Sequence, residues 1–245
     1  MRHHCILFSV FSLAVILFAT ALFRQMGHKA TLWLRDKPSS NGLWSNTQPR
    51  LIFEQVALKY GTDKVTSHGY QSMYEKYLPT IRDMPVKMLE IGLGCNMDYG
   101  PGASYYTWLE YFPMVDLYFI ELDASCVLKF QDKMANAHVF VGDQADIAFL
   151  DQFAAITTAD GLFDIVIDDG GHTMKQQITS LERLWPIVKP GGLYVIEDLQ
   201  TSYLPDYGGD SSKRNMTKLT TMNYLLEIFG LYGRDLYFEE EREQD

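Results

Sequence analysis

The sequence predicts an α/β fold, Rossmann-like and doubly wound, in which a mostly parallel sheet carries helices on both faces. Short apolar runs rich in valine and isoleucine alternate with segments of helical periodicity, which is typical of such a sheet. One run, at 86–91, passes directly into the glycine loop Gly92-Leu93-Gly94. Two later runs, within FDIVIDDGGH (163–172) and GLYVIEDLQTSY (192–203), stop abruptly in carboxylates. Ligands of open α/β sheets bind at the carboxyl ends of the strands, so these loops mark the candidate site.

Each element follows from its local pattern. Apolar residues at helical spacing predict helices at 51–60, 71–78, 104–111 and 174–185. Gly61 is a plausible C-cap for the first helix, and Pro79 stops the second. The residues that follow, 61–64, are expected to form a polar loop. The strands are expected at 86–91, 117–120, 139–141, 163–167 and 193–196. Right-handed crossovers then place all five strand ends at one edge of the sheet.

Length and charge limit the function. The chain has 245 residues, 47% hydrophobic and 21% charged, which fits one sizeable globular domain with a short extension. Its formal net charge of -10 disfavours binding to phosphate backbones, so we expect no nucleic-acid partner. The cysteines, Cys5, Cys95 and Cys126, show neither metal-ligand spacing nor a disulfide framework, and they fit a reducing compartment.

The amino-terminal region contains an unbroken run of apolar or small residues at 5–23, between Arg2 and Arg24. Its length is close to the roughly 20 residues that span a bilayer, which favours a membrane anchor. The alternative is a cleaved signal peptide, because Ala19-Thr20-Ala21 has the small-x-small form of a cleavage site. The expected division is an anchor or signal segment at 1–24, a linker rich in polar residues and proline at 25–50, and the main domain at 51–245.

The orientation of the domain follows from charge. More basic residues follow the apolar run than precede it, so the positive-inside rule places the domain in the cytosol. A lumenal domain would instead expose Asn215-Met216-Thr217, which has the form of a glycosylation sequon. We expect a membrane-bound, unglycosylated protein, with secretion after signal cleavage as the alternative. The sequence does not indicate an oligomeric state.

The two acidic strand ends predict a metal site. Several carboxylates in one crevice repel each other unless a cation or a proton intervenes, and a hard divalent metal prefers oxygen ligands. We expect Asp169, Glu197 and Asp198 to be the ligands, while Asp168 faces the other way along the extended chain. The alternative for these acids is helix capping and solvated strand ends. His172, three residues beyond Asp169, is the candidate general base; its alternative is a capping or satisfied imidazole.

A nucleoside-containing cofactor is predicted by three strand ends in order. The glycines of the loop after 86–91 permit a sharp turn and close backbone approach. Glu121 ends the second strand, where an acidic residue commonly binds ribose hydroxyls, and Asp143 after the third could accept a hydrogen bond from an adenine amine. The alternatives are a solvated carboxylate and a turn-forming aspartate. Met97 replaces the third glycine of the dinucleotide fingerprint, which disfavours nicotinamide or flavin cofactors.

Six motifs occur in a familiar order: GTDK (61–64), MLEIGLG (88–94), GDQAD (142–146), FDIVIDDGGH (163–172), PGGLYVIEDLQTSY (190–203) and PDYGG (205–209). They resemble the class I S-adenosylmethionine-dependent methyltransferases, and most closely the magnesium-dependent sugar O-methyltransferases of macrolide biosynthesis. The resemblance covers roughly residues 60–209. Its specific part is DDGGH and EDLQTSY, because the glycine loop fits any member of the superfamily.

The resemblance implies a role for each matching residue. Asp169, Glu197 and Asp198 would hold Mg²⁺, and His172 would be the general base. The residues implied in S-adenosylmethionine binding are Glu90, Gly92, Gly94, Glu121 and Asp143, with Thr62 and Lys64 near its amino-acid end and Asp168 as a further candidate. The acceptor would be a hydroxylated small molecule, a sugar or secondary metabolite.

Two departures from the family bear on this interpretation. The macrolide enzymes lack an apolar leader, so a macrolide acceptor is not expected to carry over. The family's sheet also continues beyond a fifth strand, whereas only a helix at 221–231 and a short DLYFEEE segment (235–241) follow here, so we expect an incomplete carboxyl-terminal sheet. A non-catalytic binding or scaffold protein on the same fold is therefore an alternative. A metal-dependent hydrolase is a third, without the nucleophile elbow G-x-S-x-G.

Overall fold

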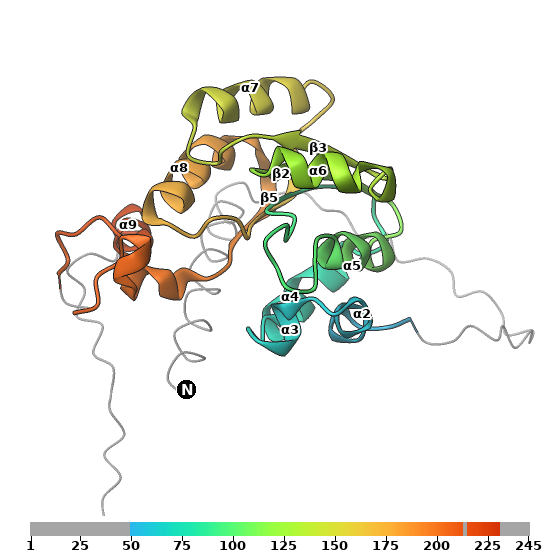
Figure 1. Ribbon diagram of the computed structural model, residues 1–245, viewed down its shortest axis with the longest axis horizontal. Helices are drawn as coiled ribbons and strands as arrows, with labels where there is room; N and C mark the ends of the chain where they lie inside the picture. Colours follow the sequence, from blue (N-terminus) through green and yellow to red (C-terminus); the bar gives the residue numbers. More distant parts are fainter. Residues whose placement is uncertain (1–49, 213–214, 231–245) are drawn as a thin grey trace, which may run out of the picture.

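A five-stranded parallel sheet forms the centre of the domain. The computed structural model describes residues 50–212 and 215–230 (Figure 1). The strands are β1 (Val86–Ile91), β2 (Val115–Glu121), β3 (Ala137–Val141), β4 (Phe163–Asp168) and β5 (Val188–Ile196). Their spatial order is β3-β2-β1-β4-β5. Strands β2 and β3 are added on one side of β1, and β4 and β5 on the other, so the order of the strands switches between β1 and β4. Ligands bind at such a switch point in open α/β sheets, and the acidic loops after β4 and β5 lie beside it.

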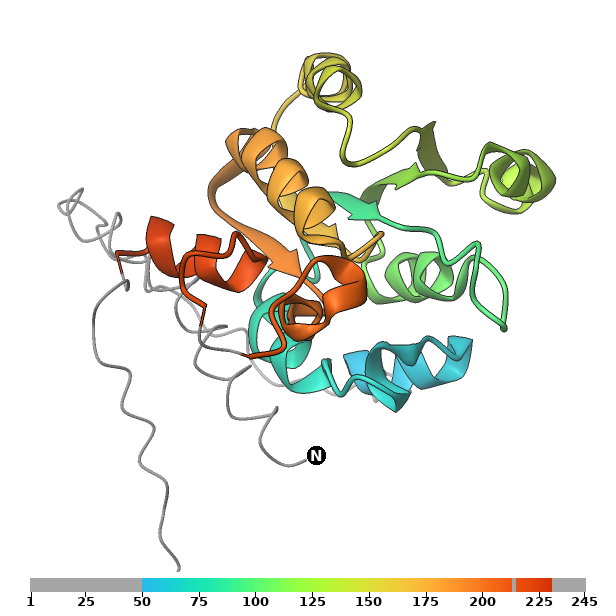
Figure 2. The same ribbon diagram turned by 60° about the vertical axis from the view of Figure 1, so that its left-hand side comes forward.

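Helices cover both faces of the sheet. They are α2 (Phe53–Tyr60), α3 (Asp63–Thr66), α4 (Gln71–Tyr77), α5 (Ala103–Tyr111), α6 (Ala124–Phe130), α7 (Ile147–Thr157), α8 (Met174–Leu184) and α9 (Thr221–Ile228). Short 3₁₀ turns join them, among which η4 (Leu199–Tyr203) and η5 (Pro205–Tyr207) follow β5. Helices α7 and α8 lie on the upper side in Figure 1, and α2, α4 and α5 lie on the lower side. Figure 2 shows the same two layers after a turn of 60°.

The alternation of side chains along each strand produces two cores. On β1, Met88 belongs to the core beneath α2, α4 and α5, while its neighbour Leu89 belongs to the core beneath α7 and α8. The first core is rich in stacked aromatic rings, including Phe53 and Trp108 with centroids 5.4 Å apart. Because β1 lies between β2 and β4, every one of its residues is buried.

Strand register brings the ends of four strands level. Ile91, the last residue of β1, pairs with Ile120 on one side and with Asp168 on the other. Asp168 in turn pairs with Ile196, the last residue of β5. Loops that are distant in sequence therefore leave the sheet at the same height, and the expected convergence of the strand ends at one edge is confirmed.

The predicted fold class and five strands are confirmed, with differences in the helices. Helices α6 and α7 were not predicted from the sequence. Each begins at an aspartate, Asp123 or Asp146, whose side chain accepts hydrogen bonds from two backbone N–H groups of the first turn. Residues 61–64 are not simply a loop, because Thr62 caps the short helix α3. Helix α9 covers most of the helix expected at 221–231.

Several expectations concern residues outside the described ranges. The apolar run, the linker before residue 50 and the acidic segment after residue 230 all lie there. Within residues 50–212 and 215–230, no helix combines the length and the apolar character that crossing a bilayer requires.

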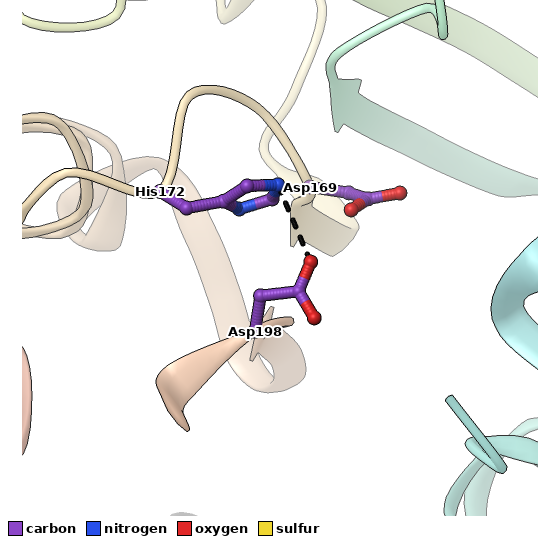
Figure 3. A group of neighbouring side chains, drawn as sticks. All are labelled: Asp169, His172 and Asp198. Carbon is purple, nitrogen blue, oxygen red and sulfur yellow. Dashed lines mark ion pairs between the residues drawn. The ribbon is translucent and has the colours of Figure 1, made fainter. Parts of the chain in front are cut away.

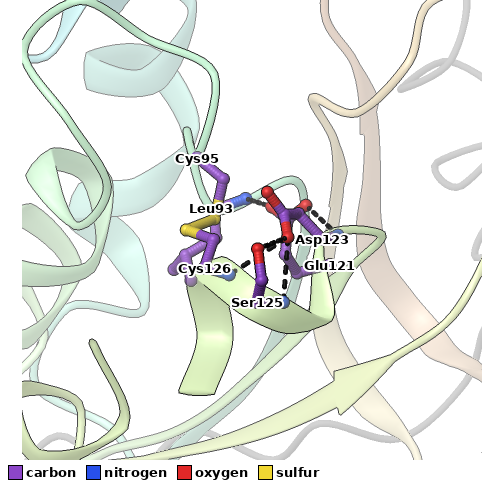
Figure 4. Close-up of a disulfide and its surroundings, with 6 residues drawn as sticks. All are labelled: Leu93, Cys95, Glu121, Asp123, Ser125 and Cys126. Carbon is purple, nitrogen blue, oxygen red and sulfur yellow. Dashed lines mark hydrogen bonds between the residues drawn. A yellow bond between two sulfur atoms is a disulfide. The ribbon is translucent and has the colours of Figure 1, made fainter. Parts of the chain in front are cut away.

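A disulfide joins Cys95 to Cys126, which corrects the expectation that the cysteines form no cross-link (Figure 4). Cys95 lies in the loop after β1, and Cys126 lies in the first turn of α6, which follows the neighbouring strand β2. Their Cα atoms are 6.0 Å apart, well within disulfide range. Two cysteines 31 residues apart carry no spacing signal; adjacent parallel strands bring them together.

Removal of this disulfide is expected to lower the free energy of unfolding by roughly 3–4 kcal/mol, because the cross-link restricts a long loop of the unfolded chain. The double variant Cys95→Ser/Cys126→Ser avoids leaving one free thiol, and denaturant titration measures the change. Reductant should destabilise the wild type by a similar amount and leave the double variant unaffected. Equal stability of wild type and double variant without reductant would show that the bond contributes nothing.

Candidate active site

Three side chains meet at the carboxyl edge of the sheet. Ligand atoms of Asp169, His172 and Asp198 all lie within 4.8 Å of one another (Figure 3). Asp169 directly follows β4, and its N–H donates to the carbonyl of Ile91, 3.0 Å away. Asp198 follows β5, and the Nε2 of His172 lies 3.3 Å from its Oδ2. The structure thus brings together the acidic ends and the imidazole that the sequence predicted to share one crevice.

His172 and Asp198 both have left-handed backbones, with φ of 59° and 55°. They are the non-glycine residues with positive φ in the described part of the chain. Such conformations are unfavourable for residues with a side chain, and they persist where surrounding contacts fix them, often at functional sites. Here Tyr70 fixes Asp198 twice: its hydroxyl accepts from the Asp198 N–H at 3.0 Å and donates to Oδ1 at 2.9 Å.

A second imidazole, His68, also contacts Asp198. Its Nδ1 lies 3.1 Å from Oδ1 of Asp198, and its Nε2 lies 3.5 Å from Oδ2 of Asp63. These two hydrogen bonds raise the pKa of His68 to about 10, so it is positively charged at neutral pH. Burial alone would raise the pKa of Asp198, but the hydrogen bond from His68 and the further one from Gln200 hold it well below its usual range.

Sequence analysis did not identify His68 or the contact of Tyr70 with the site. Both lie between α3 and α4, directly after the GTDK motif, where no strand end marks them. A His-x-Tyr pair in a polar loop carries little signal of its own. Its role becomes visible only when the fold places this loop against the end of β5.

Lys64 is the buried centre of the carboxylate cluster, with a side chain only 1% exposed. Its Nζ lies 2.5 Å from Oδ2 of Asp169, 3.0 Å from Oε2 of Glu197 and 3.1 Å from Oε1 of Glu90. Tyr74 donates its hydroxyl to the other oxygen of Glu197. Glu197 and Asp169 therefore share the ammonium of Lys64. Unlike Asp169, Glu197 is not part of the group that Asp169 forms with His172 and Asp198.

Carboxylates outnumber cations at this site. Four carboxylates lie there, those of Glu90, Asp169, Glu197 and Asp198. The cations are the ammonium of Lys64, whose pKa is well above its usual value because three carboxylates outweigh its burial, and the imidazolium of His68. Burial and the charge of Asp169 raise the pKa of Glu197 to about 8, so this carboxylate gains a proton readily.

A divalent cation fits this arrangement. It would add positive charge where carboxylates outnumber the cations, and carboxylate oxygens such as those of Asp169 and Asp198 are the kind of ligand that Mg²⁺ prefers. A buried nitrogen at the same place, Nδ1 of His172, has no hydrogen-bond partner among the described residues. A buried polar atom without a hydrogen-bond partner is a common sign of a site that binds an ion, a water molecule or a ligand.

The glycine loop packs directly against the loop that carries Asp169. Gly92 has φ of 96°, and a Cβ there would lie 2.2 Å from the carbonyl oxygen of Asp169, so glycine is required at this position. Gly94 also has positive φ, at 78°. The glycine loop and the candidate metal site are therefore one continuous region of the edge.

The acidic residues predicted to bind a cofactor flank this loop. Glu90 is fully buried and accepts the indole N–H of Trp108 at 3.0 Å. Glu121 accepts the N–H of Leu93 at 2.9 Å and that of Asp123 at 2.9 Å, which fixes the carboxylate beneath the loop (Figure 4). Glu90 precedes Gly92 by two residues, and Glu121 is hydrogen-bonded to Leu93, which lies between Gly92 and Gly94. Both carboxylates are therefore next to the glycine loop.

Thr62 and Asp143 each have a local hydrogen-bond partner. Thr62 is buried, and its hydroxyl accepts the backbone N–H of Lys64 at 3.5 Å at the start of α3. Asp143 is exposed and accepts the N–H of Ala145 at 2.7 Å, which forms a turn after β3. This is the turn-forming alternative considered for Asp143, and it leaves one carboxylate oxygen toward solvent.

Asp168 differs from the cofactor-binding role that the sequence suggested. It is fully buried, and its two oxygens accept hydrogen bonds from Gln144, at 2.9 Å, and from Ser180. Gln144 also accepts the N–H of Gly171 at 2.8 Å, just before His172. Because Asp168 and Asp169 point to opposite faces of the extended chain, Asp168 supports the loop from behind and is not directed at a ligand.

The buried charge of Asp168 predicts a pH effect on stability. Burial raises the pKa of Asp168 to about 6, whereas the unfolded chain releases this proton near pH 4. The folded state therefore binds the proton more tightly, so this group favours folding as the pH falls through 6 and opposes it above. Relative to Asp168→Asn, the wild type should gain roughly 2–3 kcal/mol between pH 7 and pH 4, measured by denaturant titration. A relative loss over this range would show that Ser180 and Gln144 stabilise the ionised form.

Known proteins with related sequences include O-methyltransferases of Streptomyces and Micromonospora. The chain is 36% identical over 173 residues to the 8-demethyl-8-α-L-rhamnosyl tetracenomycin-C 2'-O-methyltransferase of Streptomyces olivaceus, covering 70% of this chain and 44% of that protein. It is 36% identical over 179 residues to the mycinamicin VI 2''-O-methyltransferase of Micromonospora griseorubida, covering 71% and 43%. The chain spans about half the length of the curated relatives it matches, or less.

A solved structure agrees with this relationship. The MycE methyltransferase of the mycinamycin pathway, in complex with Mg and SAH, matches with a TM-score of 0.65 and 32% identity, covering 74% of this chain and 48% of that one. A second crystal of MycE contains mycinamycin VI as well, and matches with a TM-score of 0.64. No protein-family model matches the chain.

Proposed function

We propose that this chain, which belongs to the class I S-adenosylmethionine-dependent methyltransferases and is related to their sugar O-methyltransferases, transfers a methyl group to a hydroxyl of a small molecule with the help of Mg²⁺. The observation that carries the proposal is the meeting of Asp169, His172 and Asp198 within 4.8 Å, next to a glycine loop at the sheet's switch point. The acceptor is proposed to be a sugar or another hydroxylated metabolite.

The proposed metal ligands are Asp169, Glu197 and Asp198. Mg²⁺ bound there would act as a Lewis acid toward the acceptor hydroxyl and as a template for it. His172 is a weaker choice of ligand, because Mg²⁺ prefers oxygen over nitrogen. Its imidazole is partly exposed, at 20%, which suits a group that meets the acceptor.

His172 is proposed to take the proton of the acceptor hydroxyl on Nδ1, which has no hydrogen-bond partner among the described residues. Its other ring nitrogen, Nε2, lies 3.3 Å from Oδ2 of Asp198, so the imidazolium that forms is stabilised by a carboxylate whose pKa is strongly lowered. The left-handed backbones of both residues hold the two groups in this relation. Alignment of the reacting atoms supplies much of the acceleration in such a transfer, and a rigid loop is what alignment needs.

S-adenosylmethionine is proposed to lie over the glycine loop, with Glu90 toward its amino-acid end and Glu121 at the ribose. The donor's sulfonium supplies an electrophilic methyl group. Gly92 and Gly94 leave room for close approach of the backbone, and Glu121 is held in place by the N–H of Leu93. Asp143 at the next strand end has one free oxygen for the adenine.

Calorimetry and a transfer assay together test the proposal. The full chain is titrated with S-adenosylhomocysteine, and then incubated with methyl-labelled donor and a panel of hydroxylated acceptors, with Mg²⁺ or with EDTA. We expect binding of the product analogue and transfer that requires Mg²⁺. Absence of binding to the folded chain would remove the proposal. Binding without transfer to any acceptor would favour the non-catalytic binding protein considered above.

His68 is proposed to position Asp198 as a metal ligand. Replacing an outer partner of a metal-ligating group typically costs about 10–100-fold in metal affinity, so His68→Ala is expected to weaken Mg²⁺ binding by that factor. Calorimetric titration with Mg²⁺ measures the affinity without turnover. The matched control is His138→Ala, which removes an exposed His–Asp pair (3.2 Å, with Asp116) at the opposite edge of the sheet. Equal Mg²⁺ affinity in both variants would argue against the role of His68.

A further inference from the structure

We infer that Asn215 carries an N-linked glycan, and that the domain folds in the oxidising compartment where both this glycan and the Cys95–Cys126 disulfide are formed. This goes beyond the proposed methyl transfer and does not depend on it. It also reverses the cytosolic orientation expected from the basic residues that follow the apolar run.

The sequon is unique and accessible. Asn215-Met216-Thr217 is the single Asn-x-Ser/Thr tripeptide with a non-proline centre among the 245 residues. All three residues are exposed in the folded domain, and they lie in the segment that leads into α9. This segment is at the left-hand end of the molecule in Figure 1, away from β2 and β3. A glycan added before folding would therefore remain outside the core.

The local geometry presents the side-chain amide of Asn215 to solvent. Its Oδ1 accepts the hydroxyl of Thr217 at 2.7 Å and the N–H of Thr217 at 3.1 Å. The backbone of Asn215 is held at both ends: its N–H donates to Asp210 at 3.0 Å, and its carbonyl accepts the side chain of Asn223 at 3.1 Å. The amide oxygen is thus engaged in a turn, and the residue whose side-chain nitrogen would carry an N-glycan is exposed.

The disulfide is an independent indication of the compartment. Disulfides form and persist in secreted and lumenal proteins and are rare in the cytosol, where thiols are kept reduced. Its formation removes two protons and two electrons from the thiols of Cys95 and Cys126. These protons and electrons reduce the disulfide of a thiol oxidoreductase to two thiols. The bond joins the loop after β1 to the first turn of α6, and these are the two cysteines among the described residues, as suits a structural cross-link.

The modification is an ordinary group transfer. The side-chain nitrogen of Asn215 forms a bond to the anomeric carbon of a lipid-linked oligosaccharide diphosphate. The bond from that carbon to the diphosphate oxygen breaks, the lipid diphosphate leaves with the electron pair, and the nitrogen loses one proton. The donor is a membrane lipid of the secretory pathway, so the reaction reaches only chains that enter it.

Expression of the full chain in eukaryotic cells with an active secretory pathway tests the inference. Treatment with an N-glycosidase should increase the gel mobility of the wild type by one step. Asn215→Gln and Thr217→Ala should remove this step, and the matched variant Thr217→Ser should keep it, because serine preserves the sequon. Thermal melting of each variant controls for folding, and maleimide labelling of the denatured protein should reach Cys95 and Cys126 only after reduction.

Each outcome decides the question. A single step that depends on residues 215 and 217, together with protected cysteines, supports the inference. An unshifted wild type, a shift that persists in Asn215→Gln, or cysteines that react without reductant would each overturn it. None of these results changes the methyl-transfer assay, so the two proposals fail separately.

Discussion

Replacing Lys64 by methionine is expected to lower the free energy of unfolding by roughly 3–5 kcal/mol when no divalent cation is present. Methionine fills a similar volume but leaves the carboxylates of Glu90 and Glu197 without their cation in a buried site, at 0% and 3% exposure. Removing one partner of a buried ion pair costs far more than the pair contributes, because the remaining charge is neither solvated nor compensated. Denaturant titration in EDTA measures the loss.

The loss should shrink when Mg²⁺ is added, since a cation held by Asp169 and Glu197 replaces part of the missing positive charge. It should also be smaller at low pH than at high pH, because Glu197 then gains a proton; the ammonium of Lys64 lowers the pKa of Glu197, so its removal moves this proton uptake to higher pH. Lys59→Met is the matched control: its ammonium is 52% exposed and pairs with Glu110, and such surface pairs contribute at most about 1 kcal/mol. A similarly small loss for Lys64→Met would mean that the buried carboxylates do not depend on this lysine.

Replacing His172 by asparagine is expected to reduce the rate of methyl transfer by roughly 10²–10⁴-fold. Asparagine has no group that can take the acceptor proton, but it tolerates the left-handed backbone that His172 adopts, with φ of 59°, better than alanine does. The variant therefore separates loss of the base from distortion of the loop. Initial rates with labelled donor and an acceptor found in the screen measure the effect.

Binding of S-adenosylhomocysteine should be unchanged in His172→Asn, because His172 faces Asp198 and not the glycine loop. Raising the pH should restore part of the rate, since a more ionised acceptor needs less help from a base. A decrease of less than about tenfold would remove His172 from the role of general base. A parallel loss of donor binding would instead indicate that the loop had collapsed.

The edge of the sheet could be predicted from the sequence because strand ends carry two signals at once. A short apolar run gives the strand, and the acidic residue or glycine that follows or ends it gives the position, as at Asp169, Glu121 and Gly92. Parallel strands in register then make those ends meet. The choice between Asp168 and Asp169 was harder, since adjacent residues differ only in the face to which they point.

The remainder depended on contacts between segments far apart in sequence. Lys64 reaches Asp169 across 105 residues, and Tyr70 reaches Asp198 across 128. No local pattern encodes such contacts. The disulfide is similar, because its two cysteines become neighbours only through the pairing of β1 with β2. Helices α6 and α7 were missed for another reason: their capping aspartates resemble ordinary turn residues.

The close packing of Gly92 against Asp169 has a mechanical consequence. With 2.2 Å between a hypothetical Cβ and the Asp169 carbonyl, neither loop can advance without displacing the other. If a ligand at one loop shifts that loop, it is expected to change the affinity for a ligand at the other, and any such coupling is reciprocal. The main chain alone would transmit this effect, without a connecting side chain.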